Sequence, residues 1–339
     1  MNNLKNKTFI IAEVGVNHNN NLNFSKKIID FCSKEKVDAV KFQTFTADRL
    51  ALKGTKKVKY QKKNKFDKEN HFQMLKKLEL SKKDHLILKN YCDKKGVEFI
   101  STPYDVESAK FLVSMKLKTL KVASADLTDH YLHEFLSKTK KKIIISTGMS
   151  SLDQVSETLN LYPNSSKKLI SLLHCVSNYP CSDSSINLNC LELLSKFKCK
   201  IGFSDHSKGF LSSALAIAKG ATILEKHVTL DNKLPGPDHK ASLNLRDFKI
   251  FIDRVRKTEI ILGNKNKKIQ NEEKEMLSIS RKGLYFKANF TQGKKIKKED
   301  MIPLRPNTGM KILDYKKIIK KKLRFNVKKN QKVSLKYFI

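Results

Sequence analysis

The sequence lacks the segments that would send it to a membrane or out of the cell. No apolar run approaches the roughly 20 residues that a helix needs to cross a bilayer. The N-terminus leads at once into an apolar segment that contains Glu13, so no signal peptide is predicted. These absences predict a cytoplasmic protein that does not act at a membrane.

Short cysteine spacings and glycine-rich nucleotide loops are also missing. The six cysteines form no C-x-x-C pair, which argues against a disulfide framework or a zinc site and favours reduced thiols. No G-x-G-x-x-G or Walker A sequence occurs, so nothing indicates a dinucleotide or P-loop site.

Acidic residues are scarce, 33 against 69 basic ones, and the net charge is +36. Such a charge suits a nucleic-acid partner or an anionic substrate. However, lysine greatly outnumbers arginine and no basic stripe alternates with aromatics, whereas base recognition uses arginine and stacking uses aromatic rings. We expect no nucleic-acid partner, and an RNA-binding protein is the competing class.

Short β-rich runs alternate with helix-like segments along most of the chain. One predicted helix, 81–96, opens at a Ser cap and ends at Gly96, and others cover 151–162 and 244–262. The runs are 8–16, 38–45, 97–104, 119–126, 142–149, 169–176, 199–206 and 221–228. Eight such units predict an α/β fold, a (β/α)8 TIM barrel, with an open doubly wound sheet as the rival.

A change of composition predicts the domain boundaries. Residues 1–263 would form the barrel, 264–279 a polar linker and 280–339 a small β-rich module. A module of that size buries little core of its own, so we expect it to dock on another surface.

Polar side chains gather where the predicted strands end. They are Glu13, Lys41, Gln43, Ser101, Thr102, Lys121, Ser124, Asp126, Ser146, His174, Ser204, His206, Glu225 and His227. The carboxyl ends of barrel strands meet at one mouth, where TIM-barrel active sites lie. Charged side chains placed there need partners or a ligand, so the pattern predicts an active site.

The stretch "GFSDHSKG" sets Ser204, Asp205 and His206 side by side, like a hydrolytic triad. Side chains alternate along a strand, so Asp205 would point away from its two neighbours, and a nucleophile–base–orienter relay is not expected. His227 ends the next strand, and together with His206 it would form an imidazole pair for a divalent metal.

Two lysines, Lys41 and Lys121, are flanked by apolar residues. Either one forms a Schiff base with a carbonyl substrate, as in a lysine-dependent aldolase, or both bind an anion. The hydroxyls of Thr102, Ser124, Ser146 and Ser204 would add neutral donors for a phosphorylated carboxylate.

Together these motifs resemble the sialic acid synthase family. The matching stretches are "FIIAEVGVNHN", "VKFQTF", "STPYD", "LKVASADLT", "IISTGMSSLDQV", "LLHCVSNYP", "GFSDHS", "EKHVTLD" and "LPGPDHKASL", followed by "RPNTGM" of an antifreeze-protein-like (SAF) domain. The resemblance implies a synthase that condenses phosphoenolpyruvate with an N-acylated hexosamine and releases phosphate. It also implies a homodimer with a swapped C-terminal domain.

The resemblance also assigns roles. His206 and His227 would hold Mn²⁺, or another divalent ion such as Mg²⁺ or Co²⁺. The catalytic carboxylates would be Glu13, Asp126 and Glu225, although many members carry Glu at the position of Asp126. The residues expected to contact phosphoenolpyruvate are Lys41, Thr102, Lys121, Ser124, Ser146 and Ser204. Those expected near the sugar are Gln43, Tyr179, Asp238 and, from the partner subunit, an arginine that corresponds to Arg305.

Several alternatives stay open at this point. The motifs fit the neuraminate and legionaminate branches better than the pseudaminate branch, without separating the first two. Because Asp126 is one methylene shorter than the usual Glu, a paralogue that binds substrate without turning it over is a further alternative.

Overall fold

The computed structural model describes residues 7–58, 61 and 69–339. The chain divides into two compact units, Met1–Gly263 and Asn264–Ile339. No helix within the described residues is both long and apolar enough to cross a membrane.

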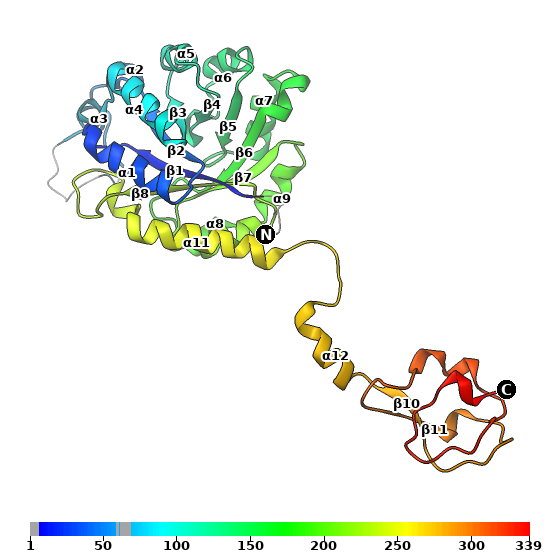
Figure 1. The fold of residues 1–339 in the computed structure, drawn as a ribbon. Coiled ribbons are helices and arrows are strands. Elements are labelled where there is room, and N and C mark those ends of the chain that lie inside the picture. Colours follow the sequence, from blue (N-terminus) through cyan, green and yellow to red (C-terminus); the bar gives the residue numbers. More distant parts are fainter. Residues whose placement is uncertain (1–6, 59–60, 62–68) are drawn as a thin grey trace. The chain divides into compact units, whose positions relative to one another are not determined.

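The first unit is a closed barrel of eight parallel strands (Figure 1). The strands are β1 (Phe9–Gly15), β2 (Ala39–Thr44), β3 (Glu98–Pro103), β4 (Thr119–Val122), β5 (Lys142–Ser146), β6 (Ile170–Cys175), β7 (Lys200–Asp205) and β8 (Ile223–Thr229). Each strand pairs with the next, and β1 also pairs with β8, which closes the ring. The predicted TIM barrel is therefore confirmed, and the open sheet is excluded.

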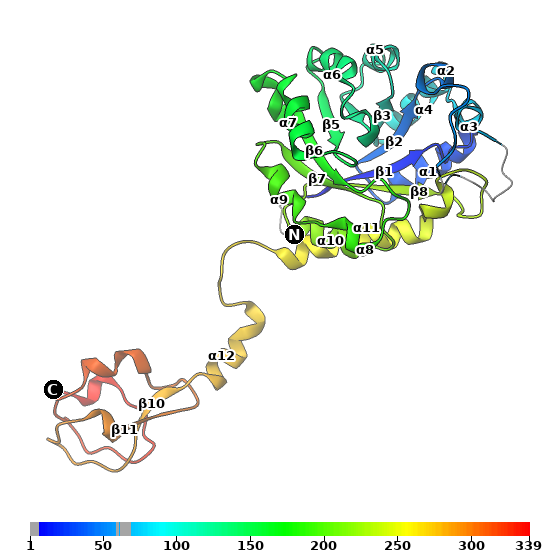
Figure 2. The same cartoon turned by 180° about the vertical axis from the view of Figure 1, so that it is seen from behind.

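Helices cover the outside of the strands. They are α1 (Leu22–Lys34), α2 (Ala47–Leu50), α3 (His71–Leu78), α4 (Lys82–Lys95), α5 (Val106–Ser114), α6 (His130–Ser137), α7 (Leu152–Asn160), α8 (Asp183–Ile186), α9 (Cys190–Ser195), α10 (Leu211–Ala218) and α11 (Leu245–Leu262). A two-residue strand, β9 (Leu243–Asn244), precedes α11 and pairs with β8. Figure 2 shows α10 and α11 side by side.

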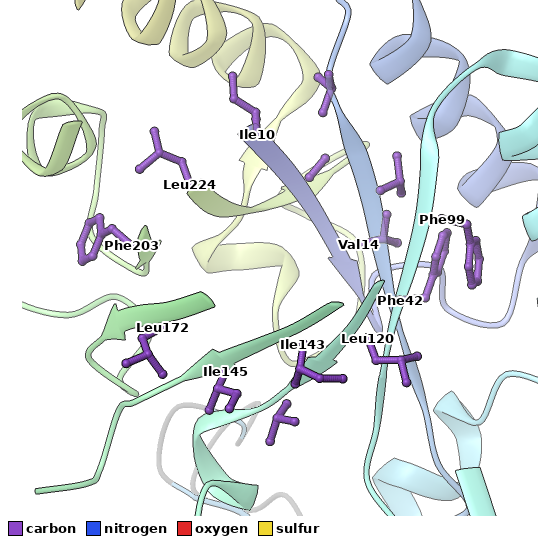
Figure 3. Packing of buried hydrophobic residues seen from close by; sticks show 14 of the residues in the cluster. Ile10, Val14, Phe42, Phe99, Leu120, Ile143, Ile145, Leu172, Phe203 and Leu224 are labelled. Carbon is purple, nitrogen blue, oxygen red and sulfur yellow. The ribbon is translucent and has the colours of Figure 1, made fainter. Parts of the chain in front are cut away.

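The main apolar core lies between the strands and the helices. Figure 3 shows its side chains, including Phe42 of β2 stacked on Phe99 of β3 with ring centres 5.2 Å apart. A second set of apolar side chains fills the interior of the barrel; it consists of Ile11, Ala39, Ile100, Ile144, Leu173 and Ile223. Because strand side chains alternate, the two sets come from successive positions of the same strands.

The largest departure from a predicted strand range is at β4. β4 ends at Val122, and Ser124–Asp126 form a 3-10 turn instead of continuing the strand. Ser124 and Asp126 therefore sit above the strand end, on a loop.

The second unit begins with a segment predicted to be a linker. This segment contains a 3-10 turn, Asn271–Glu273, and helix α12 (Lys274–Ser280). The Glu273 carboxylate accepts a hydrogen bond from the backbone N–H of Gln270 at 2.6 Å and so caps the start of these turns.

The rest of the second unit is built on a small antiparallel sheet. Its strands are β10 (Gly283–Phe286), β11 (Met301–Leu304) and β12 (Met310–Lys311), in the order β11-β10-β12. Nine buried apolar residues form its core: Leu284, Phe286, Ile296, Met301, Ile318, Leu323, Val327, Val333 and Phe338. The unit thus has a small apolar core of its own.

Candidate active site

A polar layer lies directly above the apolar floor of the barrel. On most strands the residue two positions beyond the floor residue is polar, so Glu13 follows Ile11 and Lys41 follows Ala39. The full layer is Glu13, Lys41, Thr102, Lys121, Ser146, Cys175, Ser204 and Glu225, all of them buried. The period-two alternation of strands explains why so many functional groups face one interior.

Ion pairs join this layer across the barrel. Lys41 Nζ lies 2.8 Å from Glu13 Oε2 and 3.8 Å from Glu225 Oε2. It also donates a hydrogen bond to Thr102 Oγ1 at 3.2 Å. Lys121 Nζ lies 4.0 Å from Glu225 Oε1, so this carboxylate stands between the two lysines.

Hydroxyl groups complete the layer. Lys121 Nζ donates to Ser146 Oγ at 2.6 Å and to the Val122 carbonyl at 2.9 Å. Ser204 Oγ donates to Glu225 Oε1 at 2.9 Å. These contacts involve three residues predicted to contact phosphoenolpyruvate, Lys121, Ser146 and Ser204, together with the predicted catalytic carboxylate Glu225.

The two carboxylates of the layer differ in protonation. Burial raises the pKa of Glu13 to about 7, against the opposing effect of Lys41. Burial acts in the same direction on Glu225, but Lys121 and Lys41 outweigh it and bring its pKa to about 2. Burial also lowers the pKa of Lys121, which Glu225 only partly offsets. At neutral pH the site therefore pairs an ionised Glu225 with a Glu13 that exchanges protons.

The predicted histidine pair, His206 and His227, lies nearer the mouth of the barrel than the polar layer. The ring centres of His206 and His227 are 5.7 Å apart, and the Tyr179 ring lies 4.0 Å from that of His206. Nδ1 of His206 donates to the Val176 carbonyl at 2.7 Å, so Nε2 carries the lone pair in the neutral ring. Ser204 Oγ is 3.5 Å from that Nε2, which places Ser204 and His206 on one face, as alternation predicts.

His227 fits a metal ligand by a separate observation. Its Nδ1 is buried and has no hydrogen-bond partner among the described residues. Burial, reinforced by His206, holds its pKa well below the usual value, so the imidazole is neutral and able to ligate. In the part of the chain that the structure describes, no three His, Cys, Asp or Glu side chains form a metal cluster. An ion held by the two imidazoles would take its other ligands from water or substrate.

The 3-10 turn after β4 carries Ser124 and Asp126. Ser124 Oγ accepts a hydrogen bond from the backbone N–H of Gly148 at 3.0 Å. Burial, with a contribution from Asp129 and against Lys121, raises the pKa of Asp126 to about 7. Both predicted residues thus lie at the mouth of the barrel, beside the polar layer.

Gln43 and Asp238 reach the same mouth from other elements. Gln43 Nε2 donates to Glu13 Oε1 at 3.4 Å. Burial raises the pKa of Asp238 to about 6, against the opposing effects of His206 and Lys41. Arg305 belongs to the second unit, where it is exposed just after β11.

Two of the polar strand-end residues do not face the interior. His174 faces outward: its Nε2 donates a hydrogen bond to the Ile186 carbonyl, and its ring stacks on Phe203. The hydroxyl of Ser101 shares a hydrogen bond with that of Thr44. The interior residue of β6 is instead Cys175, whose Sγ lies 3.6 Å from His206 Nδ1. Cys175 lies two residues after Leu173 of the floor, and strand alternation therefore places it in the polar layer.

Comparison with known proteins assigns this barrel to a family. A profile of the NeuB family matches residues 28–267. The chain belongs to the NeuB family. This confirms the resemblance to sialic acid synthases and the expected type of enzyme, a phosphoenolpyruvate-dependent nonulosonic acid synthase.

Two relatives and one solved structure show how far the similarity extends. The N,N'-diacetyllegionaminic acid synthase of Legionella pneumophila is 40% identical over 94% of this chain and 91% of that protein. The enzyme of the same name from Campylobacter jejuni is 37% identical over 96% and 98%. The crystal structure of an N-acetylneuraminic acid synthetase from Leptospira borgpetersenii, in complex with citrate, has a TM-score of 0.70 at 33% identity and covers 80% of this NeuB-family chain and 90% of its own.

Proposed function

We propose that this protein condenses phosphoenolpyruvate with 2,4-diacetamido-2,4,6-trideoxymannose to give a legionaminic-type acid and inorganic phosphate. The observation that carries the proposal is the pair of buried lysines, Lys41 and Lys121, on either side of Glu225 above the barrel floor. Two buried cations with hydroxyls beside them suit a ligand with one carboxylate and one phosphate. The names of both relatives favour this sugar over N-acetylmannosamine.

The chain's own residues account for the bond changes. C3 of phosphoenolpyruvate attacks the aldehyde carbon of the open-chain sugar, and the positive charge that develops at C2 is stabilised by Glu225. Glu13 takes a proton from the water that adds at C2. The C2 hydroxyl then gives up its proton and becomes the keto oxygen while the bond between C2 and the phosphate oxygen breaks and phosphate leaves. The former aldehyde oxygen takes up a proton and becomes a hydroxyl. Lys41 and Lys121 hold the anionic groups throughout, so catalysis rests on positioning and electrostatics.

The proposed metal site consists of His206 and His227. A divalent ion such as Mn²⁺, Mg²⁺ or Co²⁺ would polarise the sugar aldehyde toward attack. Tyr179, against the His206 ring, and Asp238 would contact the sugar or water at the same place.

The second unit has a proposed role as an antifreeze-protein-like domain exchanged between the subunits of a homodimer. Arg305 would then reach the sugar's N-acyl group in the partner's barrel. Its exposed side chain in a unit with its own apolar core supports such a role.

A phosphate-release assay with phosphoenolpyruvate and Mn²⁺ tests the function. Release should depend on 2,4-diacetamido-2,4,6-trideoxymannose and be much slower with N-acetylmannosamine. Faster release with the pseudaminate precursor would make the protein a pseudaminate-type synthase. No release with any of the three sugars would contradict the proposal and favour a binding-only paralogue.

A lysine Schiff-base aldolase is a second candidate, because burial lowers the pKa of Lys121 and makes its amine more nucleophilic. The proposed reaction forms no bond to lysine. Borohydride treatment with substrate should therefore leave the mass of the protein unchanged, and EDTA should stop turnover. A trapped adduct on Lys121 together with EDTA-resistant activity would favour the aldolase.

A further inference from the structure

A second buried ion pair lies behind the candidate metal site. Asp205 of β7 and Lys226 of β8 face each other in register, with Asp205 Oδ2 3.1 Å from Lys226 Nζ. Their side chains are 0% and 2% exposed. Asp205 is the member of the apparent Ser-Asp-His triad that alternation separates from the other two.

The carboxylate of Asp205 is saturated with donors from the loop and helix that follow it. It accepts from the Ser207 N–H at 2.8 Å and from the hydroxyls of Ser207, Ser212 and Ser213 at 2.7, 2.9 and 2.6 Å. Lys226 Nζ also donates to the Ser207 carbonyl at 2.6 Å. Ser212 and Ser213 belong to α10, so the pair faces the helix layer and not the interior.

Stability alone does not account for such a pair. Taking two charges out of water costs several kcal/mol per ion, and well-packed apolar residues are often as stable in their place. What a saturated buried pair supplies is a fixed geometry between the two elements that carry it.

The chain places a predicted metal ligand directly after each member of the pair. His206 follows Asp205, and His227 follows Lys226, on the opposite face of the strands. Asp205–Lys226 is also the last registered pair of the β7–β8 ladder, because β7 ends at Asp205. His206 thus stands just beyond regular strand pairing.

Besides the longer contacts with Ser204 Oγ at 3.5 Å and Cys175 Sγ at 3.6 Å, two hydrogen bonds hold His206 from one side. Its carbonyl accepts from the backbone N–H of Cys181 at 3.1 Å, and its Nδ1 donates to the Val176 carbonyl. Both bonds tie His206 to the segment after β6. Neither fixes its distance from His227, whereas the ion pair bridges β7 and β8 at that level.

We propose that Asp205 and Lys226 are positioning residues that set the spacing of the His206 and His227 imidazoles for a shared divalent ion. The inference rests on the proposed metal-dependent function. Residues behind metal ligands typically contribute 10–100-fold to metal affinity. Lys226→Met and Asp205→Asn should therefore weaken Mn²⁺ binding by about 10- to 100-fold.

The experiment measures Mn²⁺ binding to metal-free full-length protein by the loss of the free-ion electron paramagnetic resonance signal. Lys226→Arg keeps the positive charge at a similar reach, so its affinity should stay within a few-fold of wild type. The double variant Asp205→Asn/Lys226→Met removes both charges at once, so it tests the proposal where a single variant misfolds. It should bind Mn²⁺ as weakly as the single variants.

Glu259→Gln is the matched control. Glu259 is buried, pairs with Arg256 at 2.9 Å and accepts from the Thr8 N–H at 2.6 Å, next to the amino end of β1. It should lower the melting temperature without changing Mn²⁺ affinity. Wild-type affinity in folded Lys226→Met and Asp205→Asn would overturn the positioning role alone, as would equal weakening in Glu259→Gln. Wild-type protein that binds no Mn²⁺ would overturn the metal assignment and this inference together.

Discussion

The protonation of Glu13 controls the proposed reaction at the scale of single residues. Burial raises the pKa of this carboxyl to about 7, and a base acts only when ionised. We therefore expect kcat/KM to fall as the pH drops below about 7, where Glu13 binds a proton. Rates of phosphate release from pH 5.5 to 8.5 measure this decline, which we call the acid limb of the pH profile.

The matched variants for this profile are Glu13→Gln and Asp126→Asn, because burial raises the pKa of both carboxyls to about 7. Glu13→Gln should lose the limb together with about 10²- to 10⁴-fold of the rate. Asp126→Asn should keep it. A limb that disappears in Asp126→Asn and persists in Glu13→Gln would exchange the roles of the two residues.

A second prediction at this scale concerns His206. His206→Ala should lower Mn²⁺-dependent turnover by more than about 100-fold, since even outer-shell partners contribute up to that factor. His174→Ala is the control, because this histidine packs outward against Phe203. The circular dichroism spectrum should be unchanged in His206→Ala, and full activity in that variant would refute the ligand assignment.

The sequence predicts which side chains face the barrel interior wherever strand alternation alone decides their direction. Lys41, Ser204 and Glu225 were placed correctly because a period of two fixes which face each side chain shares. His174 and Cys175 show the limit of that argument. Both are able to do chemistry, they are adjacent, and sequence alone does not state which of two neighbouring positions faces the interior.

At the scale of elements, the loop after β5 is held very close to its neighbours. A Cβ on Gly148 would lie 2.5 Å from Ser177 Oγ and 2.9 Å from Ser124 Oγ. Gly148→Ala should therefore displace Ser124 and raise the KM for phosphoenolpyruvate by roughly 10-fold or more, the effect of losing one hydrogen bond to a charged group.

Gly54→Ala is the control for this loop, because nothing lies within 4 Å of its added Cβ. Initial rates at varied phosphoenolpyruvate concentration should be unchanged in Gly54→Ala. An unchanged KM in Gly148→Ala would show that Ser124 does not contact this substrate.

Element boundaries were predictable where side chains mark them. Ser81 caps α4 by accepting from the Asp84 N–H at 3.1 Å, and Gly96 ends it at a φ of +69°. The end of β4 was placed too late, because Ala123–Asp126 carries no residue that enforces a stop. The turn at Ser124–Asp126 depends on backbone bonds such as Asp126 N–H to the Ala123 carbonyl at 3.1 Å.

At the scale of the whole molecule, the exchange of C-terminal units between subunits is open to a mixing experiment. Arg305→Ala and His206→Ala should each be nearly inactive alone. After dissociation and reassembly, a mixed dimer regains one intact site, since an Arg305→Ala barrel receives Arg305 from its partner. Statistical mixing of a two-fold dimer then restores about a quarter of wild-type turnover.

The reference for this experiment is a mixture of Arg305→Ala with Glu13→Gln/Arg305→Ala, which contains no Arg305 and should stay inactive. If each Arg305 serves its own barrel, mixing Arg305→Ala with His206→Ala should restore nothing. Size-exclusion chromatography with light scattering checks that dimers form in each mixture.

The apolar floor of the barrel, from Ile11 to Ile223, has a consequence for the order of events. The lysines lie directly above this floor and the histidines nearer the mouth. In the proposed reaction phosphoenolpyruvate binds at the lysines and the sugar at the histidines. We therefore expect phosphoenolpyruvate to enter first and the sugar second. A non-reactive sugar analogue should therefore inhibit uncompetitively against phosphoenolpyruvate, because it finds its place only in a barrel already loaded beneath it.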